Sequence, residues 1–191
     1  MRILLVGGSF NPVHIGHVAT AREVGLQFGY DLMLFVPSLR PPHKRLAEEP
    51  GPNHRLAMLR LAAGDDAGMA VDDCEITRGG TSFTIDTVRD IATRYAIEGK
   101  LGLLLGDDLI PGFPSWKDPA LLASEADIIC AHRKSVERLP LSVPHRYADN
   151  PVIAVSSSLV RERIAHGQPF RHLVPESVYE YIIKEKLYGL H

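Results

Sequence analysis

The sequence predicts an α/β fold, in which one open parallel sheet carries helices on both faces. Short apolar runs alternate along the chain with segments of helical spacing, which is typical of successive βαβ units. The first two runs are closed by glycine and proline, the residues that commonly mark the end of a strand. Because the 191 residues contain no repeat or low-complexity tract, we expect one domain over residues 1–191, with a small helical part from about residue 156.

Each element is assigned from its pattern of apolar residues. We expect strands at residues 3–6, 32–36, 69–76, 101–105, 126–131 and 152–155. We expect helices at residues 18–28, 53–64, 84–95, from 119, 157–165 and 174–186, and irregular loops at 37–52 and 132–150. Gly29 is a natural stop for the first helix, while Asn53 and Asp118 are expected N-caps.

The composition is that of an ordinary globular protein, with 45% hydrophobic and 23% charged residues. A net charge of −2 gives no sign of a protein that coats nucleic acid. Cys74 and Cys130 are isolated, which is typical of a reduced chain, and the first apolar run is too short for a signal segment or membrane span. We therefore expect a cytoplasmic protein without nucleic-acid or membrane partners; an oligomer is possible.

The first strand runs into a glycine pair, Gly7 and Gly8, and then into a helix. Such a junction can bind phosphate, because glycine lets backbone N–H groups approach an anion and the helix N-terminus is electropositive. The chain contains neither G-x-G-x-x-G nor G-x-x-x-x-G-K-[ST], so other residues must serve. His14 and His17 are three residues apart and can present imidazoles on one face. Helix capping and metal binding are the alternatives, although a zinc site would need further ligands.

A second candidate anion site lies at the turn after residues 152–155. Three serines, Ser156, Ser157 and Ser158, offer hydroxyl and amide groups there, and Arg161 follows one helical turn later. The alternative is that these serines only cap a helix. The sequence therefore predicts two anion-binding turns that are far apart along the chain.

These two segments resemble the signatures of a known superfamily. Residues 7–17 are similar to the H-x-G-H motif of nucleotidyltransferases, most closely that of bacterial nicotinate mononucleotide adenylyltransferases, and residues 155–161 resemble the serine-rich second motif. The resemblance implies a Rossmann-like nucleotidyltransferase fold. It implies that ATP is contacted by Gly7, Gly8, Ser9, Phe10, His17, Ser156, Ser157, Ser158 and Arg161. It also implies that charge on the reacting phosphates is stabilised by four catalytic residues, His14, His17, Lys44 and Arg161.

Further segments at residues 81–87, 106–108, 113–116 and 173–182 also resemble this family. They imply that nicotinate mononucleotide is bound by Phe83, Thr84, Gly106, Asp108, Trp116, Lys117 and Arg133. Trp116, the only tryptophan, would stack on the pyridine ring, and the alternative is a half-buried core aromatic. The family more commonly has tyrosine at Phe83, and Pro-Gly where Lys134-Ser135 follow Arg133.

The implied reaction is transfer of AMP from ATP to nicotinate mononucleotide, which yields deamido-NAD and pyrophosphate in NAD biosynthesis. No protein nucleophile is needed, and Mg²⁺ would be bound mainly through the ATP phosphates, with no metal held by side chains. The run from Ser156 to Val160 is more typical of pantetheine-phosphate adenylyltransferase, an enzyme of coenzyme A biosynthesis. That activity and a non-catalytic nucleotide sensor are the alternatives. The sequence leaves open the oligomeric state, the preference for nicotinate over nicotinamide mononucleotide, loop motions, and ligand contact by Lys44 and Arg133.

Overall fold

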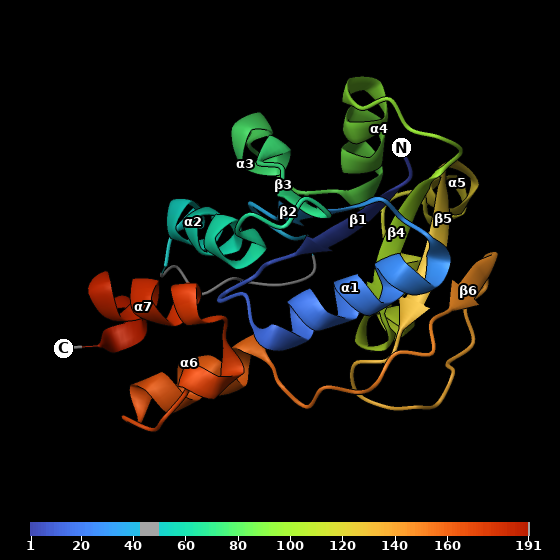
Figure 1. The fold of residues 1–191 in the computed structure, drawn as a ribbon. Coiled ribbons are helices and arrows are strands. Elements are labelled where there is room, and N and C mark those ends of the chain that lie inside the picture. Colours follow the sequence, from blue (N-terminus) through green and yellow to red (C-terminus); the bar gives the residue numbers. More distant parts are fainter. Residues whose placement is uncertain (43–49, 191) are drawn as a thin grey trace.

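A computed structural model describes residues 1–42 and 50–190 of the chain, so Lys44 lies outside the described residues. Six strands pair in parallel in the order β3-β2-β1-β4-β5-β6 (Figure 1). They are β1 (Ile3–Gly8), β2 (Leu32–Pro37), β3 (Met69–Val71), β4 (Leu101–Gly106), β5 (Ala126–Ala131) and β6 (His145–Tyr147). The predicted open parallel sheet is confirmed.

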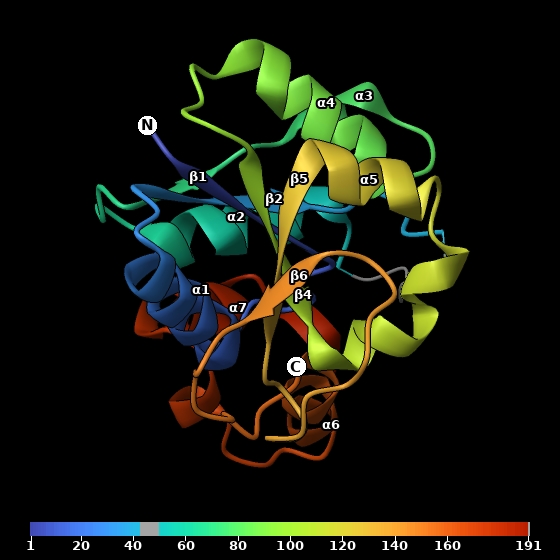
Figure 2. The ribbon, with the colours of Figure 1, turned by 90° about the vertical axis from the view of Figure 1, so that its right-hand side faces the viewer.

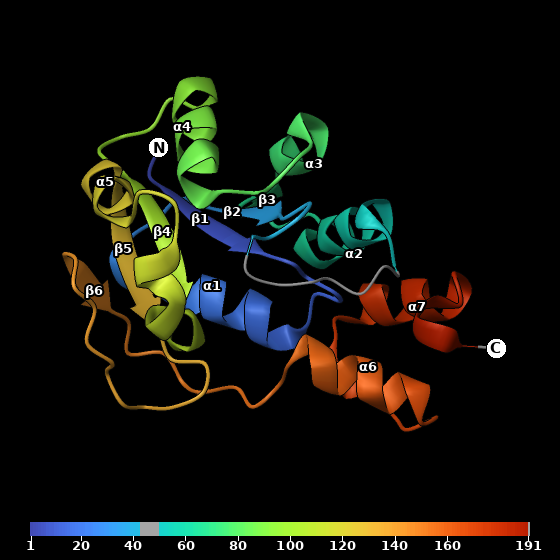
Figure 3. The same ribbon diagram turned by 180° about the vertical axis from the view of Figure 1, so that it is seen from behind.

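Helices cover both faces of this sheet. The α-helices are α1 (Ile15–Phe28), α2 (Pro52–Ala63), α3 (Cys74–Arg78), α4 (Thr84–Arg94), α5 (Pro119–Glu125), α6 (Ser157–Ala165) and α7 (Glu176–Lys184). Three 3₁₀ segments are η1 (Asp107–Ser115), η2 (Arg171–Leu173) and η3 (Leu187–Gly189). Figures 2 and 3 show α3, α4 and α5 above the sheet, with α1, α6 and α7 below it.

The core is divided by the sheet into two clusters, as the alternation of side chains along β1 shows. Leu4 and Val6 pack with residues of α1, α2 and α7, whereas Ile3 and Leu5 pack with residues of α4 and α5. A strand sends successive side chains to opposite faces, so a run that is apolar at every position is buried on both. This explains why the continuous apolar runs predict the central strands correctly.

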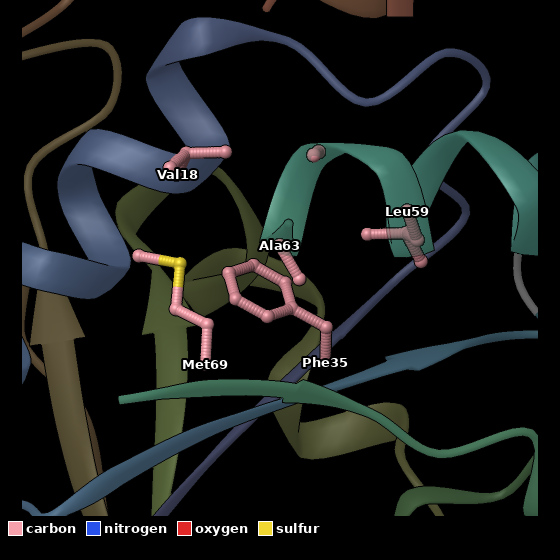
Figure 4. A pocket seen from close by; sticks show the side chains of 6 residues that line it. Val18, Phe35, Leu59, Ala63 and Met69 are labelled. Atoms are coloured by element: carbon pink, nitrogen blue, oxygen red, sulfur yellow. The ribbon is translucent and has the colours of Figure 1, made fainter. Parts of the chain in front are cut away.

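The space between α1 and α2 is closed by apolar side chains. Figure 4 shows Val18 of α1 and Leu59 and Ala63 of α2 facing Phe35 of β2 and Met69 of β3. The gap among them has no room for a water molecule. It is part of the core and not a binding site.

The strand order places a topological switch point at β1. From β1 the chain crosses to β2 on one side, and later to β4 on the other side of β1. In open α/β sheets, ligands bind at the carboxyl ends of the strands where the winding direction reverses. The segments that follow β1 and β4, residues 9–14 and 107–115, therefore flank the expected ligand crevice.

The prediction of a strand at residues 152–155 is wrong. The last strand is β6, within the segment expected to be a loop, and it pairs with β5 in the register Ile128 to His145. The backbone N–H of Val155 instead donates to Ile153 O at 2.7 Å, a local turn contact. Of this run, Val155 packs against the core and Ala154 is exposed. Whether an apolar run pairs as a strand depends on neighbours that the run itself does not specify.

Three other element predictions also need correction. The strand expected at residues 69–76 ends at Val71, because Asp72 Oδ1 accepts the N–H of Cys74 and starts α3. Gly51, not Asn53, is the N-cap of α2, with Pro52 at the first helical position. In α4 the helical spacing predicts Ala92 on the apolar face after Ile85 and Val88, but Ile91 is buried there and Ala92 is exposed. Gly29 at φ 67° and Asp118 cap α1 and α5 as predicted. Among the described helices, none has the length and apolar character needed to span a membrane.

Candidate active site

The turn after β1 is packed into the molecule. Phe10, Asn11 and His14 are buried, and the ring of Phe10 packs edge-on against His17 at 5.0 Å between ring centroids. Arg55 of α2, only 2% exposed, donates from Nη1 to the carbonyl oxygen of Ser9 at 2.7 Å. We call residues 7–17 the phosphate loop. The hydrogen bond from buried Arg55 fixes the backbone of this loop. Gly7, Gly8 and Ser9, at the carboxyl end of β1 and just after it, remain partly or fully exposed.

The two histidines predicted to act together do lie together. Their rings are stacked with centroids 3.6 Å apart, and the backbone N–H of His14 donates to His17 Nδ1 at 3.2 Å. Because Nδ1 of His17 accepts this bond, the proton of the neutral ring lies on Nε2. His17 thus has a defined N–H donor on the opposite edge of its ring, as a phosphate contact requires.

His14 is 1% exposed, and both of its ring nitrogens are buried without a hydrogen-bond partner in the described residues. Burial, aided by the positive charge of Arg133, lowers its pKa to about 3. His14 is therefore neutral at physiological pH. A buried polar group without a hydrogen-bond partner costs free energy of folding. Such groups are found at sites where a ligand or ion supplies the missing hydrogen bond.

This burial predicts a pH dependence of folding. Between pH 6.5 and about 3 the unfolded chain protonates His14 while the folded chain does not, so stability falls as pH falls. We expect His14 to account for about 2 kcal/mol of the free energy of unfolding lost between about pH 7 and about pH 5. Urea unfolding of the wild type and His14→Gln at both pH values measures this difference. Equal losses in the two proteins would contradict it.

The serine turn, residues 156–158, meets the phosphate loop, as expected if both segments contact one ATP molecule. Ser157 Oγ donates to Pro12 O at 2.8 Å, and Arg161 Nη1 donates to Asn11 O at 2.6 Å. Arg161 Nη2 also donates to Ser158 Oγ at 3.3 Å, and Ser156 caps α6 by accepting the N–H of Leu159. Two turns about 150 residues apart in sequence thus form one surface.

Gly16 explains how closely these turns approach. A Cβ atom at Gly16 would lie 2.8 Å from Cγ1 of Val155, a distance that packed atoms do not adopt. The middle position of the H-x-G-H motif therefore has a structural reason here: any side chain would push the serine turn away from the histidines.

A second group of predicted residues lies at the end of β4. Arg133 Nη1 pairs with Asp108 Oδ1 at 3.2 Å, and a Cβ at Gly106 would lie 2.5 Å from Cδ of Arg133. Asp107, which was not predicted, is buried and accepts the backbone N–H groups of Lys134 and Ser135. Its carboxylate fixes the loop that carries Arg133. The effect of Arg133 on the pKa of His14 links this group to the phosphate loop.

A third group surrounds the start of α4. Lys117 Nζ lies 4.9 Å from the ring centre of Phe83 and pairs with Asp86 at 2.9 Å. Phe83 precedes Thr84 as the N-cap of α4, and no side chain caps the helix there. Trp116, half-buried after η1, packs on Phe113 with ring centroids 5.3 Å apart. An uncapped helix N-terminus favours a carboxylate, and the carboxylate of Asp86, in the first turn of α4, already pairs with Lys117 here.

The sequence analysis missed the supporting residues of the phosphate loop. Arg55 reaches Ser9 from 46 residues away, and Tyr188 Oη donates to Asn11 Oδ1 at 2.8 Å from 177 residues away. No local pattern in the sequence signals either contact. Within the described ranges, no cluster of three or more His, Cys, Asp or Glu residues could hold a metal ion.

Comparison with known proteins identifies the family of this chain. A model of the cytidylyltransferase-like family matches residues 5–163, a range that includes both the histidine pair and Arg161. The chain belongs to this family. The matched range contains the phosphate loop, the serine turn, Arg161 and the two groups at the end of β4 and the start of α4.

Relatives extend over nearly the full chain. A protein of Borreliella afzelii is 44% identical over 188 residues, covering 98% of this chain and 97% of its own, and one of Treponema pallidum is 36% identical over 202 residues, covering 98% and 99%. Both carry the name "Probable nicotinate-nucleotide adenylyltransferase". The solved nicotinic acid mononucleotide adenylyltransferase of Plasmodium falciparum complexed with NaAD has a TM-score of 0.81 at 19% identity, covering 100% of this chain and 98% of its own. The family resemblance and the fold inferred from the sequence are confirmed.

Proposed function

We infer that this protein transfers AMP from ATP to nicotinate mononucleotide, with release of pyrophosphate. The reaction type is inferred from the junction of the two predicted anion-binding turns, where Arg161 Nη1 lies 2.6 Å from Asn11 O. The acceptor is inferred from the names of relatives that are 36–44% identical to this chain.

The residues at this junction suit a direct displacement. The 5′-phosphate of the acceptor attacks the α-phosphorus of ATP, and the bond to the pyrophosphate oxygen breaks. We propose that Nε2 of His17 and the guanidinium of Arg161 hydrogen-bond to phosphate oxygens as charge develops on them. His14, which is neutral, adds a second imidazole donor or acceptor without introducing a fixed charge. Catalysis is then mostly positioning and charge stabilisation.

The acceptor would occupy the space between the Asp108–Arg133 pair and the start of α4. Asp108 accepts hydrogen bonds from ribose hydroxyls in this proposal, and Trp116 stacks on the pyridine ring. The nicotinate carboxylate meets the uncapped N-terminus at Thr84, with Lys117 nearby. A neutral carboxamide gains less from these groups, so nicotinate mononucleotide is the favoured acceptor over the nicotinamide form.

Mg²⁺ would enter with ATP, bound mainly through phosphate oxygens. The donor set fits this arrangement, because the described residues offer no cluster of carboxylates and imidazoles for a protein-held metal. When bound, the ion would neutralise charge on the pyrophosphate leaving group. Turnover should be lost in excess EDTA and restored by added Mg²⁺. Full activity in EDTA would contradict this role.

Fluorescence provides a direct test of the acceptor position. Trp116 is the only tryptophan of the chain, so any change in indole emission reports on this one site. Nicotinate mononucleotide should quench the emission in a saturable way, since stacking brings the pyridine ring into contact with the indole. A flat titration would show that the acceptor binds elsewhere.

The reaction itself is tested by pyrophosphate release with ATP and a panel of acceptors. We expect kcat/KM to be highest for nicotinate mononucleotide, lower for nicotinamide mononucleotide, and negligible for 4′-phosphopantetheine. Release only with 4′-phosphopantetheine would reverse the assignment. ATP binding without release for any acceptor would identify a nucleotide sensor. We also propose that the protein acts in the cytoplasm, where both nucleotides are available.

A further inference from the structure

The C-terminal segment reaches into the site through one side chain. After α7, the chain turns through η3, and Tyr188 directs its hydroxyl to the side chain of Asn11, with Oη 2.8 Å from Oδ1. Asn11 is 3% exposed and lies in the middle of the phosphate loop. The contact joins residues that are 177 positions apart, so it depends on the whole chain being folded.

Both the side chain and the backbone carbonyl of Asn11 accept hydrogen bonds. Its side chain accepts the Tyr188 hydroxyl, and its carbonyl oxygen accepts Arg161 Nη1 at 2.6 Å. Three residues later the backbone N–H of His14 donates to His17 Nδ1. A shift of Asn11 would therefore move Arg161 at one end and the histidine pair at the other, and these are the groups proposed to contact the triphosphate.

The hydroxyl of Tyr188 is suited to act as a fixed donor. Burial raises its pKa well above the ordinary range, although the guanidinium groups of Arg161 and Arg55 act in the opposite direction. The hydroxyl therefore stays protonated at any working pH. Tyr188 also adopts φ 63° and ψ 30°, a left-handed conformation that residues other than glycine rarely adopt.

We propose that Tyr188 is a positioning residue for adenylyl transfer: its hydrogen bond to Asn11 sets the phosphate loop in the position at which the histidines and Arg161 act on one triphosphate. This inference rests on the proposed function. It predicts that loss of the hydroxyl lowers turnover and leaves the acceptor site unchanged, because in the described part of the chain no hydrogen bond, ion pair or ring contact joins Tyr188 to Asp108, Trp116 or Lys117.

Tyr188→Phe removes the hydroxyl and keeps the ring. We expect kcat to fall about tenfold, since small displacements of catalytic groups are costly, while KM for nicotinate mononucleotide stays within about twofold. Tyr181→Phe is the matched control: it removes a hydroxyl from the same end of the chain, one that pairs with His54 at 2.9 Å. The control should keep the wild-type kcat.

A double-mutant cycle with Asn11→Ala separates positioning from general packing. If the hydroxyl acts through Asn11, the double variant should lose no more kcat than the larger of the two single losses. Additive losses, a wild-type kcat in Tyr188→Phe, or equal losses in Tyr188→Phe and Tyr181→Phe would each overturn the proposal.

A readout without turnover keeps this inference separate from the proposed function. The imidazole ¹H–¹⁵N resonances of His14 and His17 should shift in Tyr188→Phe and stay in place in Tyr181→Phe. If the wild type released no pyrophosphate with any acceptor, the proposed function would fail, while these resonances would still decide whether Tyr188 sets the loop. Unshifted resonances in Tyr188→Phe would contradict the positioning role even in an active enzyme.

Discussion

Replacing His17 by alanine should lower kcat by about 10²- to 10³-fold, the usual cost of removing a donor to developing negative charge. The ring is fixed in the protein before any ligand arrives, by the N–H of His14 at its Nδ1 and by stacking on His14 at 3.6 Å. Its Nε2–H is thereby directed without further ordering. The acceptor should bind as in the wild type, because its proposed contacts lie after β4 and at the start of α4.

Two measurements check this expectation together. Steady-state pyrophosphate release gives kcat, and quenching of Trp116 gives the dissociation constant for nicotinate mononucleotide. His166→Ala is the matched control, since His166 is an exposed histidine at the end of α6 whose ring Nδ1 is bonded to Glu162 O. Wild-type turnover in His17→Ala would remove the imidazole from the mechanism.

Replacing Arg161 by alanine should be comparably severe, with kcat/KM for ATP lower by about 10²-fold or more. Two contacts, to Asn11 O and Ser158 Oγ, orient the guanidinium, and a guanidinium has five N–H donors. In our proposal the remaining donors bind phosphate oxygens of ATP. Arg161→Lys should recover only part of the loss, because an ammonium group keeps the charge but not the forked geometry.

The matched control for Arg161 lies on the same helix. Arg163 donates from Nη1 to the carbonyl oxygen of Pro169, a residue outside the phosphate loop and the serine turn. Arg163→Ala should keep kcat/KM for ATP near the wild-type value, which would show that losing positive charge from α6 is not itself the cause. Equal losses in the two alanine variants would contradict a specific role for Arg161.

The sequence predicts the centre of the fold better than its edges. The runs that became β1, β2, β4 and β5 are apolar at nearly every position, and such runs are buried on both faces of a parallel sheet. The edge strand β6 reads His145-Arg146-Tyr147, which has no apolar pattern. Its position is fixed by pairing with β5 and by the preceding loop, so tertiary contacts determine it.

The candidate site likewise contains residues that the sequence predicts and residues that it does not. The proximity of the histidine pair, the serine turn and Arg161 could be predicted because each lies in a short segment that resembles a family motif. Arg55 and Tyr188 could not, since each acts through one hydrogen bond to a distant loop residue. The ion pair between Asp108 and Arg133 joins two residues that were predicted separately. Lys44 lies outside the described residues, so its contact with ATP stays a prediction.

The claim that both turns act on one triphosphate can be measured in a crystal structure of the protein with a non-hydrolysable ATP analogue. Our account predicts that His17 Nε2 and at least one Nη atom of Arg161 lie about 2.7–3.2 Å from oxygens of the same triphosphate. A triphosphate bound by only one of the two turns, with the other facing solvent, would contradict the account.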